Sequence, residues 1–115
     1  MVRNTKQANV IHQPRGGKGT MKLHPIMTQE ELEGCTTLLA KVVLEPSSEI
    51  GYHQHVGETE AYYVLSGEGY FLDSDGSKKE VIAGDICTIE EGQSHGMINS
   101  SHQLPMEIIA IVIKK

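Results

Sequence analysis

The sequence contains no tryptophan and only one phenylalanine, Phe71, among its 115 residues. Because tryptophan and phenylalanine are scarce, the hydrophobic core must consist mainly of valine, isoleucine, leucine, methionine and the four tyrosines. The hydrophobic fraction of 38% and the charged fraction of 22% are typical of a folded globular protein rather than a disordered chain. The length predicts a single domain over residues 1–115, and so small a core favours association into a homodimer.

The sequence also lacks an excess of basic residues and any long apolar run. Its net charge is -5 at neutral pH, which disfavours nucleic acid as a partner. No apolar run reaches the length of a membrane span, and residues 1–5 lack the apolar core of a secretory signal. The two cysteines, Cys35 and Cys87, form no CxxC pair, so we interpret them as buried free thiols rather than as a disulfide. Together these features predict a cytoplasmic protein.

Residues 1–35 are predicted to form an N-terminal arm that is irregular up to about residue 20 and packs on a neighbouring subunit. The segment Gly16–Thr20 superficially resembles a phosphate-binding loop. It lacks the four-residue spacer between glycines, and a further glycine separates its lysine from its threonine, so we reject that interpretation. The cations of the segment Arg15–Lys18 are nevertheless candidates for holding an anionic ligand.

One short helix is predicted at the end of this arm. Thr28 would cap its N-terminus, and Glu31, three residues later, would complete a capping box. Gly34 would end the helix after little more than one turn.

From residue 36 to residue 113 the sequence is typical of short strands. Runs of apolar and β-branched residues are separated by turn residues, and no helical pattern alternates with them. The segment Asp73–Gly76 favours a hairpin because Asp-Gly tolerates the positive φ of tight turns. The pattern therefore predicts an all-β sandwich or barrel. The predicted strands are 38–44, 61–65, 69–72, 79–82, 86–89, 95–98 and 107–113.

Three histidines and one glutamate stand near the ends of these strands. His53 and His55 are two residues apart, so in an extended chain both imidazoles point to the same face. Glu60 follows Gly57, which would let the chain turn back, whereas His95 must be brought in by the fold. Three imidazoles and one carboxylate suit Mn, Fe, Co, Ni, Cu or Zn better than Ca or Mg. The sequence therefore predicts one divalent transition metal ion per chain.

Each of these residues also has a non-functional interpretation. A His-x-His pair often belongs to a polar strand face or a turn, and Glu60 by itself would be a solvated carboxylate at a strand end. His95 by itself would be a loop histidine. The spacing of all four residues and the glycines around them favour the metal site.

Two spaced motifs in this region resemble those of the cupin family. The first comprises His53-Gln54-His55, Glu60 and Gly67, and the second comprises Gly84, Gly92, His95 and Asn99, both with the family's spacing. The resemblance extends over residues 36–113 and implies a jelly-roll β-barrel. Two turn positions depart from the family pattern, since Ser47 replaces the opening glycine of the first motif and Glu90 replaces the proline of the second.

The resemblance implies that His53, His55, Glu60 and His95 project into the barrel lumen and leave coordination positions open for water or a small molecule. Mn, Fe, Ni and Zn are the favoured metals, with Co and Cu as further candidates. By strand alternation Tyr62 shares the face of Glu60, and Met97 shares the face of His95, so both are candidates for the ligand pocket.

The sequence also predicts where several residues outside the metal site lie in the fold. Lys41 lies in an apolar run and is predicted on the outer surface, because buried lysines are rare without a partner. Asn99 is expected to be structural and Glu90 to be an exposed turn carboxylate. On the last strand, two sets remain open as the inward face: Met106, Ile108 and Ala110, or Glu107, Ile109 and Ile111.

The first functional hypothesis is a metal-dependent enzyme, a decarboxylase or dioxygenase, that acts on a small organic acid or sugar-like ligand. The site resembles that of oxalate decarboxylases, but decarboxylation needs a proton donor, and the sequence does not choose among Glu58, Glu90 and Glu91. Catalytic residues are therefore not assigned.

The alternative is a non-catalytic module that binds a small carboxylate-bearing molecule. A metal that only braces the fold is the least favoured hypothesis, because closed structural sites are usually tetrahedral and often contain cysteine.

Overall fold

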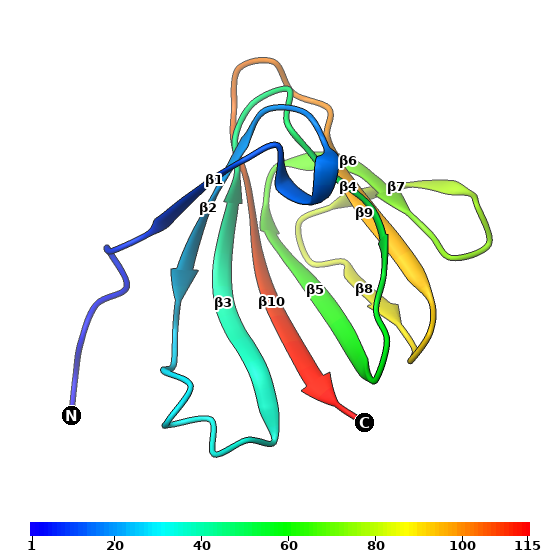
Figure 1. Ribbon diagram of the computed structural model, residues 1–115. Coiled ribbons are helices and arrows are strands. Elements are labelled where there is room, and N and C mark those ends of the chain that lie inside the picture. Colours follow the sequence, from blue (N-terminus) through cyan, green and yellow to red (C-terminus); the bar gives the residue numbers. More distant parts are fainter.

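The computed structural model describes residues 1–115 and consists of two antiparallel sheets (Figure 1). The six-stranded sheet has the order β1-β2-β3-β10-β5-β8, and the four-stranded sheet has the order β4-β9-β6-β7. No helix in it has the length and apolarity needed to cross a membrane. The elements are β1 (Asn9–His12), η1 (Pro14–Gly16), β2 (Thr20–Pro25), β3 (Thr36–Leu44), β4 (Glu49–Gln54), β5 (Glu58–Ser66), β6 (Glu68–Leu72), β7 (Lys78–Ile82), β8 (Ile86–Ile89), β9 (Ser94–Asn99) and β10 (Met106–Lys114).

The predicted all-β jelly roll is confirmed. Each strand predicted from residue 38 onward is present, with ends that differ by at most three residues, and β4 is an additional strand. In the predicted hairpin, the Asp73 N–H donates to the Ser77 carbonyl at 2.9 Å, and Gly76 adopts a φ of 84°. Glycine accepts this left-handed conformation without a steric penalty.

The core lies between the two sheets and follows from the alternation of side chains along each strand. The structure decides which face of β10 is internal, because Met106, Ile108 and Ala110 are almost completely buried. On the opposite face Glu107 lies 3.9 Å from Lys41, so the prediction that Lys41 faces outward is confirmed.

The N-terminal arm is more regular than predicted. β1 and β2 form a hairpin whose tip carries η1, and β2 pairs with β3, so residues 9–25 extend the large sheet. The prediction of an irregular segment up to about residue 20 holds for residues 1–8 and is wrong from Asn9 onward. Turn-forming glycines dominate this part of the sequence, and the pairing of its short strands depends on β3.

The predicted helix at Thr28 is also wrong, although its cap forms. The Thr28 N–H donates to Glu31 Oε1 at 2.9 Å, and the Glu31 N–H donates to Thr28 Oγ1 at 3.1 Å. One helical hydrogen bond follows, from the Leu32 N–H to the Thr28 carbonyl. Glu33 and Gly34 then take φ values of 54° and 77°, which end the turn before a helix can propagate. The only helix is the three-residue η1.

The two cysteines are free, as predicted, but only Cys87 is buried, whereas Cys35 is exposed. Burial raises the pKa of the Cys87 thiol to about 11.

We expect a thiol reagent at pH 8 to modify Cys35 rapidly and Cys87 only after unfolding. Because the unfolded thiol ionises first, Cys87 should also make the protein less stable as pH rises above about 9. Mass spectrometry of alkylated native and denatured protein tests the first expectation; rapid double modification of native protein would contradict it.

Candidate metal centre

The fold brings His53, His55, Glu60 and His95 together between the two sheets, and we call these four residues the His/Glu cluster. His53 lies on β4 directly opposite His95 on β9. A register shift between Ile50 and His53 changes the direction of the end of β4, and His55 comes directly after that strand. Glu60 comes from β5 of the other sheet. The cluster therefore depends on both sheets being packed together.

The donor atoms of the His/Glu cluster are closely spaced. His53 Nε2 lies 3.0 Å from His55 Nε2. Glu60 Oε1 lies 2.8 Å from both His55 Nε2 and His95 Nε2. Ligand atoms at about 2.1 Å from a metal lie about 3.0 Å apart at a 90° bond angle and about 3.4 Å apart at the tetrahedral angle. The three short edges of the cluster match ligand atoms about 90° apart, and all four donor atoms lie within 4.8 Å of one another.

Hydrogen bonds on the far side of two rings leave their Nε2 lone pairs free. His53 Nδ1–H donates to the Gly51 carbonyl at 2.6 Å, and His55 Nδ1–H donates to Glu58 Oε1 at 2.8 Å. In neutral imidazoles with Nδ1 protonated, both Nε2 atoms are acceptors. Two lone pairs then face each other at 3.0 Å without a proton between them. Such an arrangement is stable when a cation lies between the two nitrogens.

Glu60 and His95 also lack the partner that a bound cation would supply. Glu60 Oε1 and both ring nitrogens of His95 are buried and make no hydrogen bond, because their close contacts lack hydrogen-bond geometry. Leaving buried polar atoms unpaired is costly unless a bound ion supplies the missing partner. The residues present therefore fit a divalent metal ion.

The surroundings keep the ring atoms in a binding-competent state. Burial lowers the pKa of His53. Its imidazole therefore stays neutral, and able to bind a metal, at pH values at which an exposed histidine would be protonated. The Tyr62 ring stacks on His95 with centroids 4.8 Å apart, and Phe71 packs edge-on at 5.8 Å. Burial and the neighbouring Glu60 raise the pKa of Tyr62, so its hydroxyl stays protonated. Packing, rather than a hydrogen bond at Nδ1, holds the His95 ring.

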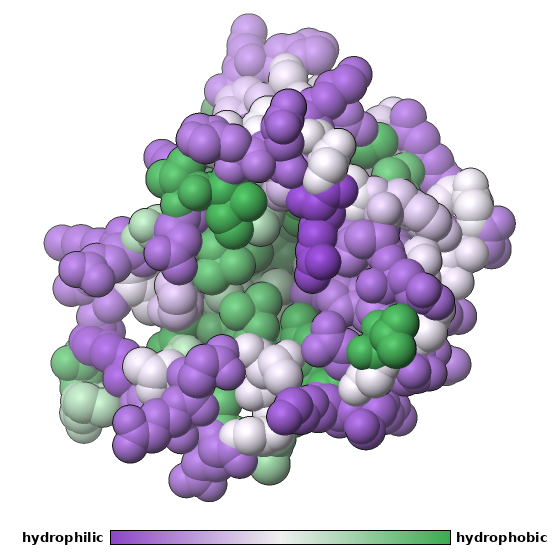
Figure 2. Space-filling model, viewed as in Figure 1, coloured by the Kyte–Doolittle hydropathy of each residue, from purple (hydrophilic) through white to green (hydrophobic).

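A cavity of about 300 Å³ opens onto one side of the His/Glu cluster. His53, His55 and Glu60 line it, whereas His95 closes the cluster on the core side. The space-filling view shows a hollow with apolar walls in this face of the molecule (Figure 2). A metal ion held by the cluster would therefore face the cavity.

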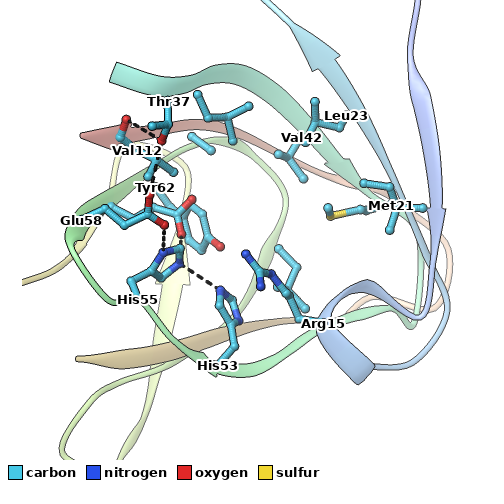
Figure 3. A pocket seen from close by; sticks show the side chains of 15 residues that line it. Arg15, Met21, Leu23, Thr37, Val42, His53, His55, Glu58, Tyr62 and Val112 are labelled. Atoms are coloured by element: carbon cyan, nitrogen blue, oxygen red, sulfur yellow. Dashed lines mark hydrogen bonds and ion pairs between the residues drawn. The ribbon is translucent and has the colours of Figure 1, made fainter. Parts of the chain in front are cut away.

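Arg15 brings a positive charge to the same cavity, where its side chain lies next to His53 (Figure 3). Its backbone φ of 52° is left-handed, a conformation that costs a non-glycine residue about 1–2 kcal/mol. The turn that carries Arg15 rests on β4, since a Cβ atom on Gly51 would lie 2.1 Å from the Arg15 carbonyl oxygen. Only a glycine at position 51 leaves room for this contact.

The structure separates the other predicted site residues. Tyr62 lines the cavity, whereas Met97 is completely buried in the core and is not among the lining residues. Of the three carboxylates considered as proton donors, only Glu58 lines the cavity, and Glu90 and Glu91 are exposed.

Outside the cavity, Asn99 is structural, as predicted. Its side-chain N–H groups donate to the carbonyls of Leu44, Glu45 and Leu104. Ser47, which replaces the family glycine, takes a φ of 59°, and its hydroxyl lies 2.6 Å from His102 Nδ1. The loop at this departure therefore keeps the left-handed backbone that a glycine would favour.

The sequence named Glu58 only as one of three candidate proton donors, and its contact with His55 is a finding of the structure. We expect Glu58→Gln to lower metal affinity about 10–100-fold, because the carboxylate fixes the tautomer and raises the basicity of His55. Metal titration followed by calorimetry measures the effect, with Glu90→Gln as the matched exposed control. Equal affinities in the two variants would contradict an orienting role for Glu58.

Comparison with known proteins places this geometry in a family. The family model described as a cupin domain matches residues 40–112. An oxalate-binding protein from Thermotoga maritima is 37% identical over 103 residues, which cover 90% of this chain and 84% of that protein.

Solved structures agree with this relationship. The crystal structure of a predicted oxalate decarboxylase from Thermotoga maritima has a TM-score of 0.93 at 34% identity, with 100% of both chains covered. A Cupin 2 conserved barrel domain protein from Salinispora arenicola has a TM-score of 0.77 at 18% identity, with 99% of this chain and 88% of that chain covered, and shares the fold. The chain belongs to the cupin family.

Proposed function

We propose that this cupin is a metal-dependent binding protein for small carboxylates, with His53, His55, Glu60 and His95 as the ligands of one divalent transition metal ion. The observation that carries the proposal is the cavity onto which three of the four residues open. Arg15 lines the same cavity and adds a second positive charge for an anion. The relative from Thermotoga maritima named an oxalate-binding protein supports the same class of ligand.

When bound, the metal supplies a positive charge and open coordination positions for carboxylate oxygens. The protein supplies the rest of the site. The Gly51 carbonyl and Glu58 orient two imidazoles, and the buried Tyr62 ring holds a third. Arg15 attracts the anion and is positioned to donate hydrogen bonds to it.

Manganese, iron, nickel and zinc are the metals favoured for this site. Imidazole suits zinc, iron and nickel, and carboxylate oxygen suits manganese. Metal supply in the cell decides the final occupancy.

Elemental analysis of protein purified without chelators or a polyhistidine tag tests the metal. We expect about one transition metal ion per chain, and oxalate binding by calorimetry only in the metal-loaded protein. Removal of the metal should abolish the oxalate signal, and its return should restore it. The proposal is wrong if protein reconstituted with Mn, Fe, Ni or Zn retains no stoichiometric metal.

A metal-dependent decarboxylase remains the second candidate, because Glu58 is a carboxylate that both lines the cavity and contacts the His/Glu cluster. Conversion of oxalate and one proton into formate and carbon dioxide would establish it. Incubation of metal-loaded protein with oxalate, followed by NMR detection of formate, separates an enzyme from a binding module. Ligand binding without product supports the binding module.

We also propose that the protein is a cytoplasmic homodimer. The outer face of the six-stranded sheet supports dimerisation, since Tyr63, Leu65 and Ile113 are each at least 40% exposed there. Covering this face would bury apolar area that a single short chain cannot bury internally. Sedimentation velocity at micromolar concentration is expected to show a dimer, and a stable monomer would refute it.

A further inference from the structure

We propose that the cavity binds carboxylates that carry a short branched apolar tail, with the carboxylate at the metal and Arg15 and the tail against Met21, Leu23 and Leu38. This inference rests on the proposed metal-dependent carboxylate binding and specifies its ligand class. It differs from oxalate, which is charged at both ends and offers no apolar surface.

The cavity has two chemically different ends. One end carries the His/Glu cluster, Glu58 and Arg15. Beyond Arg15, the close-up shows Met21, Leu23 and Val42 on the opposite wall (Figure 3). A ligand that spans the cavity therefore meets charge at one end and hydrocarbon at the other.

Strand register explains why the second end is apolar. β2 pairs with β3 so that Met21 lies opposite Leu44 and Leu23 lies opposite Val42. Alternation directs these residues and Leu38 to the inner face of the sheet. Met21, Leu23 and Leu38 are only partly buried, whereas Val42, which also lines the cavity, is 3% exposed and Leu44 is completely buried. The partly buried side chains thus form an apolar wall that is open to the cavity.

The cavity is larger than a bound oxalate would fill. Its volume of about 300 Å³ is at the lower end of the range of pockets that enclose small organic ligands. Oxalate has six non-hydrogen atoms and would leave the apolar end in contact with water. A ligand with the same paired oxygens at its head and three or four further carbons would cover Leu23 and Leu38.

The expected gain in affinity follows from apolar burial. Each methylene removed from water improves binding about fourfold when it is fully buried. Pyruvate and 4-methyl-2-oxopentanoate share the same 2-oxo-carboxylate head and differ by three carbons. Full burial of three carbons would favour the longer acid about 60-fold, and since the cavity is open on one side, we expect about tenfold.

Calorimetry with the Mn-loaded full chain tests the inference, using oxalate, pyruvate and 4-methyl-2-oxopentanoate. We expect all three to bind and 4-methyl-2-oxopentanoate to bind about tenfold more tightly than pyruvate. In Leu23→Asn the ratio of the two affinities should fall below about threefold. The matched control is Lys22→Asn on the outward face of the same strand, which should keep the preference.

The outcomes separate the two proposals. Equal affinity for pyruvate and 4-methyl-2-oxopentanoate in the wild type would overturn the apolar-tail inference alone, while carboxylate binding stands. A preference that persists in Leu23→Asn would also overturn the assignment of the tail to this wall. Failure of all three acids to bind metal-loaded protein would refute the proposed function itself. Because the wild-type comparison needs no variant, a folding defect in Leu23→Asn leaves the test decisive.

Discussion

Metal-induced stabilisation of the protein is expected to disappear when Glu60 is replaced by glutamine. Glu60 Oε1 is the donor atom that approaches two histidines, His55 and His95, each at 2.8 Å. Glutamine keeps the volume but removes the anionic charge that balances a divalent ion. In the wild type, metal at about 100 times its dissociation constant should stabilise the fold by about 2.7 kcal/mol. In Glu60→Gln, metal at that concentration should change the melting temperature by less than about 1 °C.

Without metal, the same substitution should not lower the stability of the protein. A buried carboxylate without a hydrogen bond destabilises the empty site, so Glu60→Gln is expected to be at least as stable as the metal-free wild type. Thermal unfolding with and without Mn measures both effects. Glu107→Gln, on the outer face of β10, is the matched control and should retain the full metal response. A metal response in Glu60→Gln equal to that of the wild type would exclude Glu60 as a ligand.

Replacing Gly51 by alanine is expected to affect both stability and ligand binding. An added Cβ would lie 2.1 Å from the Arg15 carbonyl oxygen and 2.8 Å from the Gly17 amide nitrogen. Backbone atoms cannot give way like the end of a flexible side chain, so η1 must move away from β4. Overpacking of this kind costs about 1–3 kcal/mol. Because η1 carries Arg15, oxalate affinity should fall about tenfold or more in the metal-loaded variant.

Gly76→Ala is a control that separates the steric effect at Gly51 from the general effect of replacing a glycine. Gly76 lies in the β6–β7 hairpin, where an added Cβ meets no atom within 4 Å. Its φ of 84° makes Gly76→Ala costly for the backbone, but the cavity should be unaffected. Chemical denaturation and calorimetry with oxalate are the measurements. If both variants lose stability but bind oxalate as the wild type does, the turn does not contribute to the site.

The sequence alone determined the strands of the barrel and the membership of the cluster. Apolar runs broken by turn residues are local signals, so the strands from β3 to β10, except β4, could be predicted within three residues. The spacing of His53, His55, Glu60 and His95 identified the cluster, and strand alternation placed Tyr62 in the cavity. Such inferences succeed because they depend on period and spacing along one chain.

The tertiary structure decided everything that depends on one segment meeting another. β1 and β2 have weak local signals and form because β3 offers an edge for pairing. The capping box at Thr28 formed without a helix, since the left-handed Glu33 ends the turn. Arg15 reaches the cavity only because Gly51, far along the chain, permits a close backbone contact. The histidines and the glutamate could thus be read from the sequence, whereas the cavity that they face results from the packing of η1, β2 and β4.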